Sequence, residues 1–292
     1  MKKLLVVINP IAGKGFAPRL LESAGKSPLH KTYLVDMVLT EGSGHALSLA
    51  RKACEEGYDA VVAAGGDGTV NEVASGLIGT PVALGIIASG SGNGFARQLG
   101  YSMDPMKAMT QIACSGSRKI DTLLINGNPG INVSGFGFDG HVAWQFNHSG
   151  HRGLSTYTRI AIRELFKFAS IRFRLEIDGN KIEREAHMLV VANSREFGNA
   201  AIIAPDADIA DGKVDIVLVK RPPLHRIPGL FFRLFRGTLK NSRDVEFLSC
   251  SSVKGEMDRL VHYHVDGEAK EPVRQIQIEV KPASLTILQP GP

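Results

Sequence analysis

The chain has 292 residues, of which 43% are hydrophobic and 22% are charged, and its formal net charge is +5. This composition is typical of a globular protein with a sizeable core, and it excludes wholesale disorder. The net charge is too small to indicate nucleic acid as a partner. It is compatible with anionic ligands or with an anionic membrane surface.

The cysteines and the amino-terminal sequence bear on where the protein works. Cys54, Cys114 and Cys250 lie far apart, which is typical of a reducing compartment without a disulfide framework. The apolar run at 4–8 is too short for the core of a signal peptide. No segment has the length needed to span a bilayer. We therefore expect a cytoplasmic protein.

Short apolar runs alternate with helical patterns over the first 120 residues. Strands are predicted at 4–8, 33–39, 60–64 and 82–87, and helices at 17–24, 46–55, 70–77, 95–99 and 105–114. This alternation with short connections predicts an α/β domain built on a doubly wound parallel sheet. Ligands of such sheets bind beyond the carboxyl ends of the strands.

Four turns follow these strands, at 10–15, 40–44, 65–69 and 88–94, and we expect them to gather at one edge of the sheet. The most informative stretch is Gly-Gly-Asp-Gly-Thr-Val-Asn-Glu at 65–72. Glycines let backbone N–H groups approach phosphates, and the N-terminus of the following helix adds partial positive charge. A nucleotide site is favoured over a tight turn with an N-capping Asp or Thr.

Within this stretch, the N–H groups of Gly66, Gly68 and Thr69 can bind phosphate oxygens. Asp67 can orient Mg²⁺, or it can accept the proton of an attacking hydroxyl. The alternative role for Asp67 is an N-cap.

Two further polar residues stand in glycine-rich turns. Lys14 lies between two glycines after the first strand, where its ammonium can bind phosphate or remain a solvated loop lysine. Ser91, also flanked by glycines, can hydrogen-bond a phosphate or a ribose, or it can be an ordinary turn residue.

From residue 120 onward, strand-like segments follow one another with few helices between them. They lie at 120–126, 130–138, 172–177, 187–193, 214–220, 244–250, 260–265 and 273–280, with helices at 154–168 and 227–239. This pattern predicts an antiparallel β-sandwich or barrel. We place domains at 1–122 and 123–292, closely packed with a cleft between them, and the last residues are candidates for packing back on the first domain.

The stretch 220–243 holds seven basic residues and no Asp or Glu. It includes Leu-Phe-Phe-Arg-Leu-Phe-Arg at 230–236. Mixed aromatic and basic residues on a short helix suit docking at an anionic bilayer surface. The alternative is a core-packed helix whose arginines face water.

Taken together, these residues resemble the diacylglycerol kinase catalytic-domain family, whose bacterial lipid kinases share motifs with sphingosine kinases. The matching motifs, in chain order, are Ile8-Asn9-Pro10 with Gly13-Lys14-Gly15, Gly65 to Thr69 with Asn71-Glu72, Gly90-Ser91-Gly92-Asn93 with Phe95-Ala96-Arg97, Ala204-Pro205-Asp206-Ala207 with Asp211-Gly212, and Val265-Asp266-Gly267-Glu268. The resemblance covers nearly the whole chain. It implies an ATP-dependent transfer of a phosphoryl group to the hydroxyl of a diacylglycerol-like or sphingoid-like lipid.

The resemblance also implies roles for individual residues. The nucleotide contacts it implies, besides the loop lysine named above, are Asn9, Thr40, Gly66, Gly68, Thr69, Asn71, Glu72 and Ser91. Glu268 is similar to the family's proton acceptor, and Asp67 is the rival because the related sphingosine kinases use that aspartate. A structural Mg²⁺ is implied at the Asp211 side chain and the backbone oxygens of Asp208 and Lys213.

One position departs from the family pattern. Bacterial members usually carry Asn-Asp where this chain has Asn93-Gly94, and the form found here is closer to that of sphingosine kinases. This departure leaves open a nucleotide-binding regulatory protein without turnover. An NAD kinase also stays open, because its family shares the Gly-Gly-Asp-Gly-Thr turn. The implied partner is a lipid at the inner face of the membrane, reached by peripheral contact, and a homo-oligomer is left open.

Overall fold

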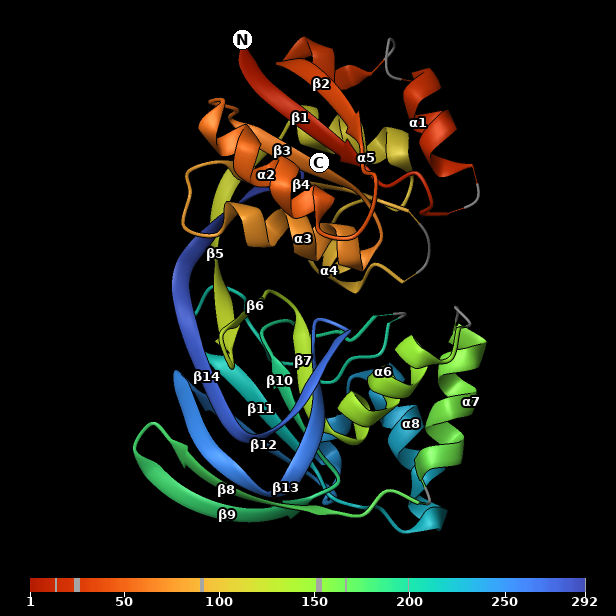
Figure 1. Cartoon of the computed structure of the whole chain (residues 1–292), viewed down its shortest axis with the longest axis vertical. Coiled ribbons are helices and arrows are strands. Elements are labelled where there is room, and N and C mark those ends of the chain that lie inside the picture. The colour runs from red at the N-terminus through yellow and green to blue at the C-terminus, as the bar shows by residue number, and fades with distance from the viewer. Residues whose placement is uncertain are drawn as a thin grey trace. The chain divides into compact units, whose positions relative to one another are not determined.

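The computed structural model describes residues 1–13, 15–23, 27–89, 92–150, 154–165, 167–198 and 200–291, with only the backbone given for 154 and 155. It divides into two compact units (Figure 1), Met1–Thr122 with Pro282–Pro292, and Leu123–Lys281. The chain passes from the first unit to the second within β5 (Gly116–Ile125) and returns within β14 (Glu268–Gln289). The carboxyl-terminal residues therefore belong to the first unit.

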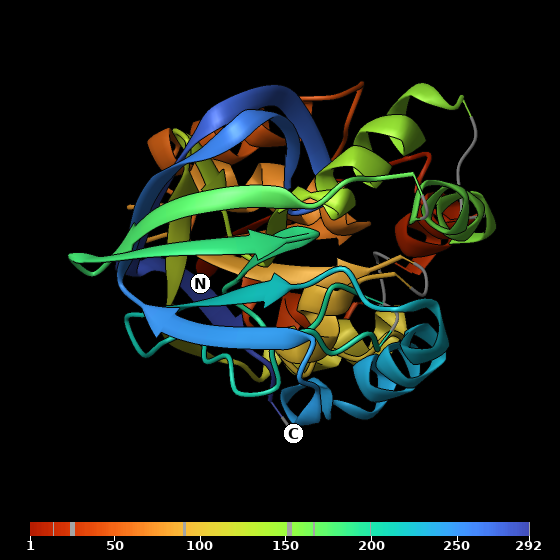
Figure 2. The same ribbon diagram turned by 90° about the horizontal axis from the view of Figure 1, so that it is seen from below.

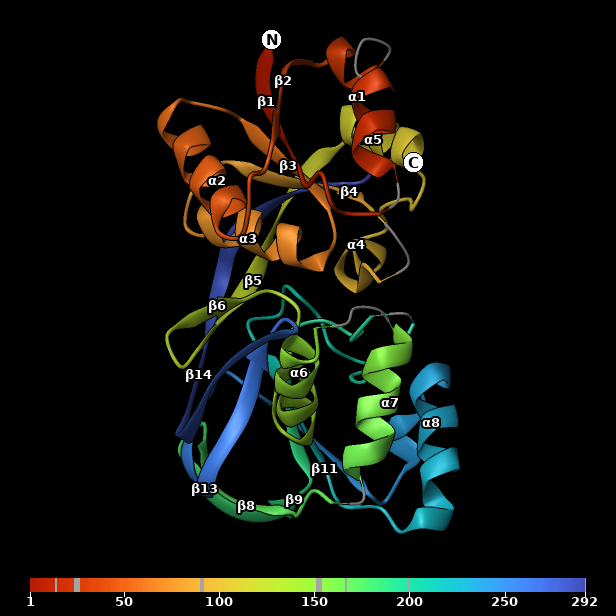
Figure 3. The same ribbon diagram turned by 45° about the vertical axis from the view of Figure 1, so that its right-hand side comes forward.

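The first unit is a parallel sheet with helices on both faces. Its other elements are β1 (Lys2–Ile8), α1 (Phe16–Ser23), a 3-10 turn (Pro28–Lys31), β2 (Tyr33–Leu39), α2 (His45–Glu55), β3 (Ala60–Gly65), α3 (Asp67–Leu77), β4 (Ala83–Ala88), α4 (Gly94–Gln98) and α5 (Pro105–Ala113). The strand order is β14–β4–β3–β1–β2, and every neighbouring pair is parallel. Figure 3 shows α2 and α3 on one face and α1 and α5 on the other. The predicted doubly wound sheet is confirmed.

Burial explains why the central strands of this unit are continuous apolar runs. Every residue of β3 and β4 is buried, and so are the last five residues of β1. Because helices cover both faces of the sheet, these central strands need no polar side for solvent. The edge strand β2 differs, since most of its residues are exposed or half-buried. The helices α2 and α3 approach closely at Gly76, where an added Cβ would lie 2.7 Å from the Ala50 Cβ.

The second unit is an antiparallel β-sandwich domain, as predicted. Besides the two shared strands it holds β6 (Asn128–Gly130), β7 (Val133–Gly137), α6 (Phe138–His148), α7 (Leu154–Leu165), β8 (Ile171–Ile177), β9 (Asn180–Ala186), β10 (Met188–Ala192), β11 (Val214–Val219), a 3-10 turn (Leu224–Arg226), α8 (Ile227–Arg236), a 3-10 turn (Leu239–Asn241), β12 (Val245–Cys250) and β13 (Ser252–Val265). The order is β12–β11–β10–β7–β13–β14, with β8 beside β13 and β9 beside β8. Figures 1 and 2 show α6, α7 and α8 at one side of these strands. Within the described residues, no helix has both the length and the apolar character needed to cross a membrane.

Three hairpins of this unit close through two-residue turns whose residues both have positive φ. They are Asn126-Gly127, Asp178-Gly179 and Asp266-Gly267. Asn-Gly and Asp-Gly suit this turn type, because its backbone twist matches that of the flanking strands. The turn chemistry therefore fixes the registers Ile125↔Asn128, Ile177↔Asn180 and Val265↔Glu268.

Strand β10 separates two apolar cores, since successive side chains of a strand point to opposite faces. Leu189 and Val191 pack in one cluster with β8, β13 and β14, whereas Val190 and Ala192 pack in the other. Leu230 and Leu234 of α8 cover this second cluster. The inner face of α8 is thus anchored to the sandwich.

Several parts of the expected secondary structure were wrong or missed. The strands expected at 260–265 and 273–280 are longer, and begin at Ser252 and Glu268. The predicted strand at 130–138 is split into β6 and β7, and α6 begins at Phe138. An added Cβ at Gly140 would lie 2.3 Å from the His262 carbonyl oxygen, so glycine lets α6 lie directly on β13. The helix expected from residue 70 begins three residues earlier, at Asp67, and β9 was not predicted because its sequence is mostly charged.

We predict that Gly76→Ala lowers the free energy of unfolding by about 1–3 kcal/mol, because its Cβ would overlap α2. The matched control is Gly229→Ala in α8, where no atom lies within 4 Å of the added Cβ. At position 229, alanine forms helix better than glycine does, so the free energy of unfolding should rise by about 0.5–1 kcal/mol. Urea denaturation of both variants checks the pair, and equal effects would contradict close packing of α2 on α3.

Candidate functional site

Polar residues of the first unit meet where the strand order reverses. Strand β1 lies between β2 and β3, so the connections that leave β1 and β3 run to opposite faces of the sheet. Asn9, directly after β1, donates its side-chain amide to Thr69 Oγ1 at 3.1 Å. Such a switch point at the carboxyl ends of strands is where doubly wound sheets bind ligands.

The Thr69 side chain explains the first glycine of the turn. A Cβ at Gly65 would lie 2.6 Å from Thr69 Oγ1 and 2.8 Å from its Cβ, so a larger residue would collide with Thr69. The buried Thr69 therefore folds back over the end of β3. This brings the amide groups at the start of α3 to the carboxyl edge of the sheet.

Asp67, the first residue of α3, is half-buried and holds an unsatisfied oxygen. Its Oδ1 is buried and accepts no hydrogen bond from the described residues. Burial raises the pKa of the Asp67 carboxyl, and the positive charge of Arg97 in α4 opposes this effect. A Cβ added at Gly92 would lie 3.6 Å from Asp67 Oδ2, so the second glycine-rich turn adjoins this carboxylate.

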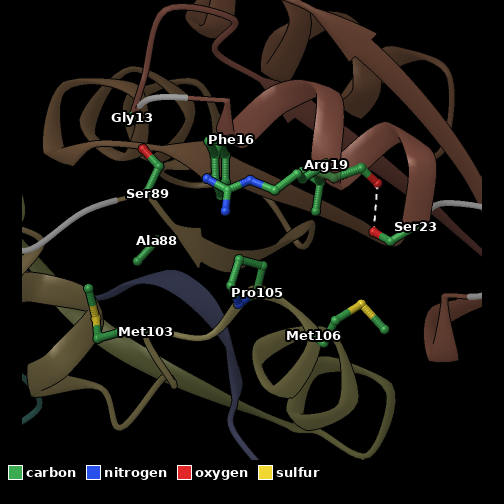
Figure 4. A pocket seen from close by; sticks show the side chains of 10 residues that line it. Gly13, Phe16, Arg19, Ser23, Ala88, Ser89, Met103, Pro105 and Met106 are labelled. Carbon is green, nitrogen blue, oxygen red and sulfur yellow. Dashed lines mark hydrogen bonds between the residues drawn. The ribbon is translucent and has the colours of Figure 1, made fainter.

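A pocket of about 420 Å³ opens at the same edge, beyond β4. Gly13, Phe16 and Arg19 line it from the β1–α1 segment, and Met103 and Pro105 line it from the opposite side (Figure 4). Its further lining residues are Leu20, Ser23, Ala88, Ser89 and Met106. The Ser89 Oγ atom is buried and has no hydrogen-bond partner among the described residues. The edge thus holds two buried oxygens that a ligand can satisfy.

Glu72, expected at the nucleotide, binds the backbone of the neighbouring turn. Its Oε1 accepts the Gly44 N–H at 2.9 Å, and its Oε2 accepts the Ala46 N–H at 3.1 Å. A carboxylate there satisfies free amide donors at the N-terminus of α2 and is favoured by the helix dipole. Glu72 therefore fixes the 40–44 turn against α3.

The other predicted nucleotide contacts are distributed along the same edge. Thr40 is buried, and its N–H donates to the Ile8 carbonyl at 2.8 Å. Gly66 caps α3, and the Cβ position of Gly68 faces open space. Asn71 accepts a hydrogen bond from the Ser75 hydroxyl at 3.2 Å.

Lys14 and Ser91 lie outside the described residues. Their assignment to the nucleotide therefore stays a prediction. The turns around them are represented by Gly13 and Ser89, which both line the pocket.

In the second unit, the turn that precedes Glu268 is held by a buried aspartate. Asp266 accepts the N–H groups of Ile131 and Asn132 at 2.8 and 3.0 Å, and its own N–H donates to Ser134 Oγ at 3.1 Å. Burial raises the pKa of Asp266 from 3.8 to about 6, although the two amide donors favour its charged form. Sequence reasoning did not assign this structural role, which depends on contacts across 134–135 residues.

His264 extends the same network inward. Its Nδ1 accepts the Gly267 N–H at 3.1 Å, and its Nε2 lies 3.4 Å from Asp139 Oδ2. Both side chains of this pair are buried. Sequence reasoning missed Asp139, although Gly-Phe-Gly-Phe-Asp-Gly at 135–140 is a glycine-rich signal that could have drawn attention to it.

Glu268 itself is exposed at the start of β14. Its Oε2 lies 3.1 Å from the Lys270 Nζ, and 68% of its side chain is accessible. The rigid Asp266–Gly267 turn fixes the backbone from which it projects. Its carboxylate is therefore accessible to solvent, with the Lys270 ammonium beside it.

The predicted metal ligands lie in two turns before β11. The Ala210 N–H donates to Asp208 Oδ1 and the Lys213 N–H donates to Asp211 Oδ1, each at 3.0 Å. All three predicted ligands are exposed. The pKa of nearby Asp215 is raised mainly by burial and also by the charge of Asp211. A divalent cation, which prefers such oxygen donors, would relieve this repulsion.

Comparisons with known proteins cover the whole chain. A family model described as diacylglycerol kinase catalytic domain matches residues 3–125, and one described as YegS C-terminal NAD kinase beta sandwich-like domain matches 132–289. A diacylglycerol kinase of Mycobacterium tuberculosis (strain ATCC 25618 / H37Rv) is 30% identical over 99% of this chain and 95% of its own. One of Bacillus subtilis (strain 168) is 26% identical over 92% and 90%. The crystal structure of a diacylglycerol kinase from Bacillus anthracis str. Sterne shares the fold, with a TM-score of 0.79, 22% identity, and coverage of 99% of this chain and 97% of that one.

We expect Glu72→Gln to lower the free energy of unfolding by about 1–3 kcal/mol, because the new amide group cannot accept the second N–H bond. Glu41→Gln is the control, since the Glu41 side chain is 88% exposed in the adjoining turn. Thermal denaturation compares the two variants. The assigned contact would be wrong if both changes left the melting temperature equally unaffected.

The raised pKa of Asp266 predicts a pH dependence of stability. The folded chain holds this proton up to about pH 6, whereas an exposed aspartate loses it near 3.8. The group therefore adds stability at low pH, and this contribution is lost as the pH rises through 6. Urea unfolding between pH 4 and 7 should show this loss in the parent chain and not in Asp266→Asn.

The control for that experiment is Glu185→Gln, an exposed carboxylate on β9. Its unfolding free energy should follow that of the parent chain across the pH range. Identical pH dependence in the parent and Asp266→Asn proteins would show that this carboxyl is ionised throughout.

Proposed function

Since the chain belongs to the diacylglycerol kinase catalytic-domain family, we propose that it transfers the γ-phosphoryl group of ATP to the hydroxyl of a diacylglycerol-like lipid. The names of the relatives favour a glycerolipid acceptor. A sphingoid-like alcohol is the second candidate, because the Asn93-Gly94 sequence differs from the usual bacterial pattern.

The observation that carries this proposal is the environment of Asp67. Its carboxylate stands at the N-terminus of α3, at the switch point of the sheet, with a buried oxygen that has no described partner. Helix N-termini at this position favour phosphate binding. An unsatisfied buried carboxylate oxygen costs stability unless a ligand or cation completes its coordination.

The backbone of the turn supplies the phosphate contacts in this proposal. The N–H groups of Gly66, Gly68 and Thr69 begin α3, where the first amides have no partner inside the helix. The buried oxygen of Asp67 fits a Mg²⁺ ion, which prefers carboxylate ligands. When bound, Mg²⁺ would neutralise phosphate charge.

Two carboxylates compete for the role of proton acceptor. Asp67 has a raised pKa, which makes it a stronger base than an exposed aspartate. Glu268 is accessible and projects from a turn that Asp266 holds rigid. We propose Glu268 as the acceptor and Asp67 as the group that holds the nucleotide's cation.

We also propose a structural Mg²⁺ at the turns of Asp208 and Asp211. The Asp211 carboxylate and the backbone oxygens of Asp208 and Lys213 would hold it. The repulsion between Asp211 and Asp215 supports a cation there.

A kinase acting on NAD is the alternative, favoured by the description of the second matching domain as NAD kinase-like. A protein that binds nucleotide without turnover is the other. Labelled ATP offered with diacylglycerol vesicles, sphingosine vesicles or NAD separates these functions by the product formed.

We predict that Asp67→Asn and Glu268→Gln each lower phosphoryl transfer about 10²–10⁴-fold. Their binding properties should differ, because Glu268→Gln keeps Mg²⁺-dependent ATP affinity whereas Asp67→Asn loses it. Asp59→Asn is the control, since this carboxylate accepts the Lys3 N–H at the opposite end of the sheet. Steady-state assays and isothermal titration with ATP measure the two properties.

The two roles would be exchanged if Asp67→Asn bound ATP normally and Glu268→Gln did not. Near-native transfer by a folded Asp67→Asn protein would contradict the site. Labelling of NAD alone would replace the lipid kinase with the NAD kinase, and ATP binding without any labelled product would support the regulatory protein.

A further inference from the structure

Helix α8 is apolar on two opposite faces. Its inner face, Leu230 and Leu234, packs on the core beneath it. Its outer face carries Phe231, Phe232 and Phe235, which are 50%, 62% and 54% exposed. A globular protein normally covers such an apolar helix face, and the outer face of α8 is left open to solvent.

The three phenylalanines form one stripe along the helix. Successive residues of an α-helix are rotated by about 100°, which places Phe235 between Phe231 and Phe232 when viewed down the axis. Leu224, which is also exposed, lies in the 3-10 turn just before α8. The stripe is therefore continuous over the exposed side of the helix. In Figure 3, α8 lies at the right-hand margin of the second unit.

Positive charge borders this stripe, and no acidic residue does so within 220–243. Arg226 and Lys240 are neutralised by Asp244 and Asp206. Arg233 and Arg236 of α8 form no ion pair with a carboxylate in the described part of the chain, and the Arg236 guanidinium lies 5.1 Å from the Phe232 ring centre. Two arginine charges are thus available beside the aromatic stripe.

We propose that α8 docks on an anionic lipid bilayer, with the phenylalanine stripe among the acyl chains and Arg233 and Arg236 at the lipid phosphates. Aromatic residues on one face with flanking arginines match the interfacial position of a surface helix. The choice of a bilayer over other anionic partners rests on the proposed function, because a kinase of membrane lipids must meet its substrate there.

A second copy of the chain fits this surface less well. A symmetric contact between two α8 helices would bring the same arginines of both copies into one interface. Like charges placed opposite one another oppose association, whereas anionic lipids attract them. The aromatic stripe therefore points to a bilayer.

Co-sedimentation with vesicles tests the proposal without any need for turnover. The vesicles are phosphatidylcholine alone or mixed with phosphatidylglycerol, at low and high salt. We expect binding to the anionic vesicles that weakens as salt rises. Arg233→Glu with Arg236→Glu should weaken that binding about 30-fold or more, since each basic residue near a charged surface adds about 1 kcal/mol. Phe231→Ala with Phe235→Ala should weaken it about tenfold or more at both salt concentrations.

The matched control is Lys31→Glu with Lys181→Glu, because both lysines are exposed and form no ion pair within the described residues. This variant should bind vesicles like the parent chain. Circular dichroism and thermal melting confirm that each variant is folded. The α8 variants should melt close to the parent chain, because Phe231, Phe235 and Arg236 are exposed and Arg233, although half-buried, forms no ion pair in the described part of the chain.

Unchanged vesicle binding by both α8 variants would overturn the proposal, as would an equal loss in the lysine control. If ultracentrifugation shows that the phenylalanine variant loses self-association while it keeps vesicle binding, the stripe is an interface between copies. The docking proposal is also wrong if the parent chain does not bind vesicles and the stripe is needed only to bind an acidic protein.

A short-chain, water-soluble diacylglycerol used as the acceptor distinguishes failure of the proposed kinase function from failure of the docking proposal. Transfer to this acceptor together with unaltered vesicle binding by the variants would reject docking and keep the kinase. Vesicle binding that depends on α8, without transfer to any acceptor, would keep docking and reject the kinase.

Discussion

The Thr69 side chain fills the space that a Cβ at Gly65 would need, and the arrangement of the first unit's functional edge depends on this contact. Because residue 65 has no side chain, β3 can end directly beneath Thr69 and α3 can begin only two residues later. The Thr69 hydroxyl then receives the amide of Asn9 from the neighbouring strand. The absence of a side chain at residue 65 therefore lets the loops after β1 and β3 contact each other. It also places the free N–H groups of α3 at the carboxyl edge of the sheet.

Much of the fold could be predicted because its strands are either wholly buried or closed by distinctive turns. The limits of β3 and β4 match the apolar runs within one residue, since strands covered on both faces have no polar interruptions. The start of α6 could not be predicted. Its first turn, Phe138-Asp139-Gly140, continues an apolar, glycine-rich strand, and only contact with β13 makes the chain helical there.

The sequence predicts which loops form the candidate site. It does not predict the contacts between their side chains. Four turns after parallel strands must share an edge, and the contact between Asn9 and Thr69 joins two of them. The partners of Glu72 could not be foreseen, because its carboxylate reaches the amides at 44 and 46 only once α2 and α3 are packed. The roles of Lys14 and Ser91 stay predictions.

Aspartates in similar Asp-Gly sequences have different chemistry because their surroundings differ. Both carboxylate oxygens of Asp266 accept backbone N–H groups, so this residue stabilises a hairpin. Asp211 is exposed, and its Oδ1 accepts the N–H group of Lys213 within the same turn. Asp67 differs from both, because it is partly buried and its Oδ1 has no hydrogen-bond partner among the described residues. A carboxylate gains catalytic value when burial raises its free energy and no neighbour relieves it, because the incoming ligand then supplies the missing interaction. By this criterion Asp67, and neither of the other two, is the aspartate that a bound cation would satisfy.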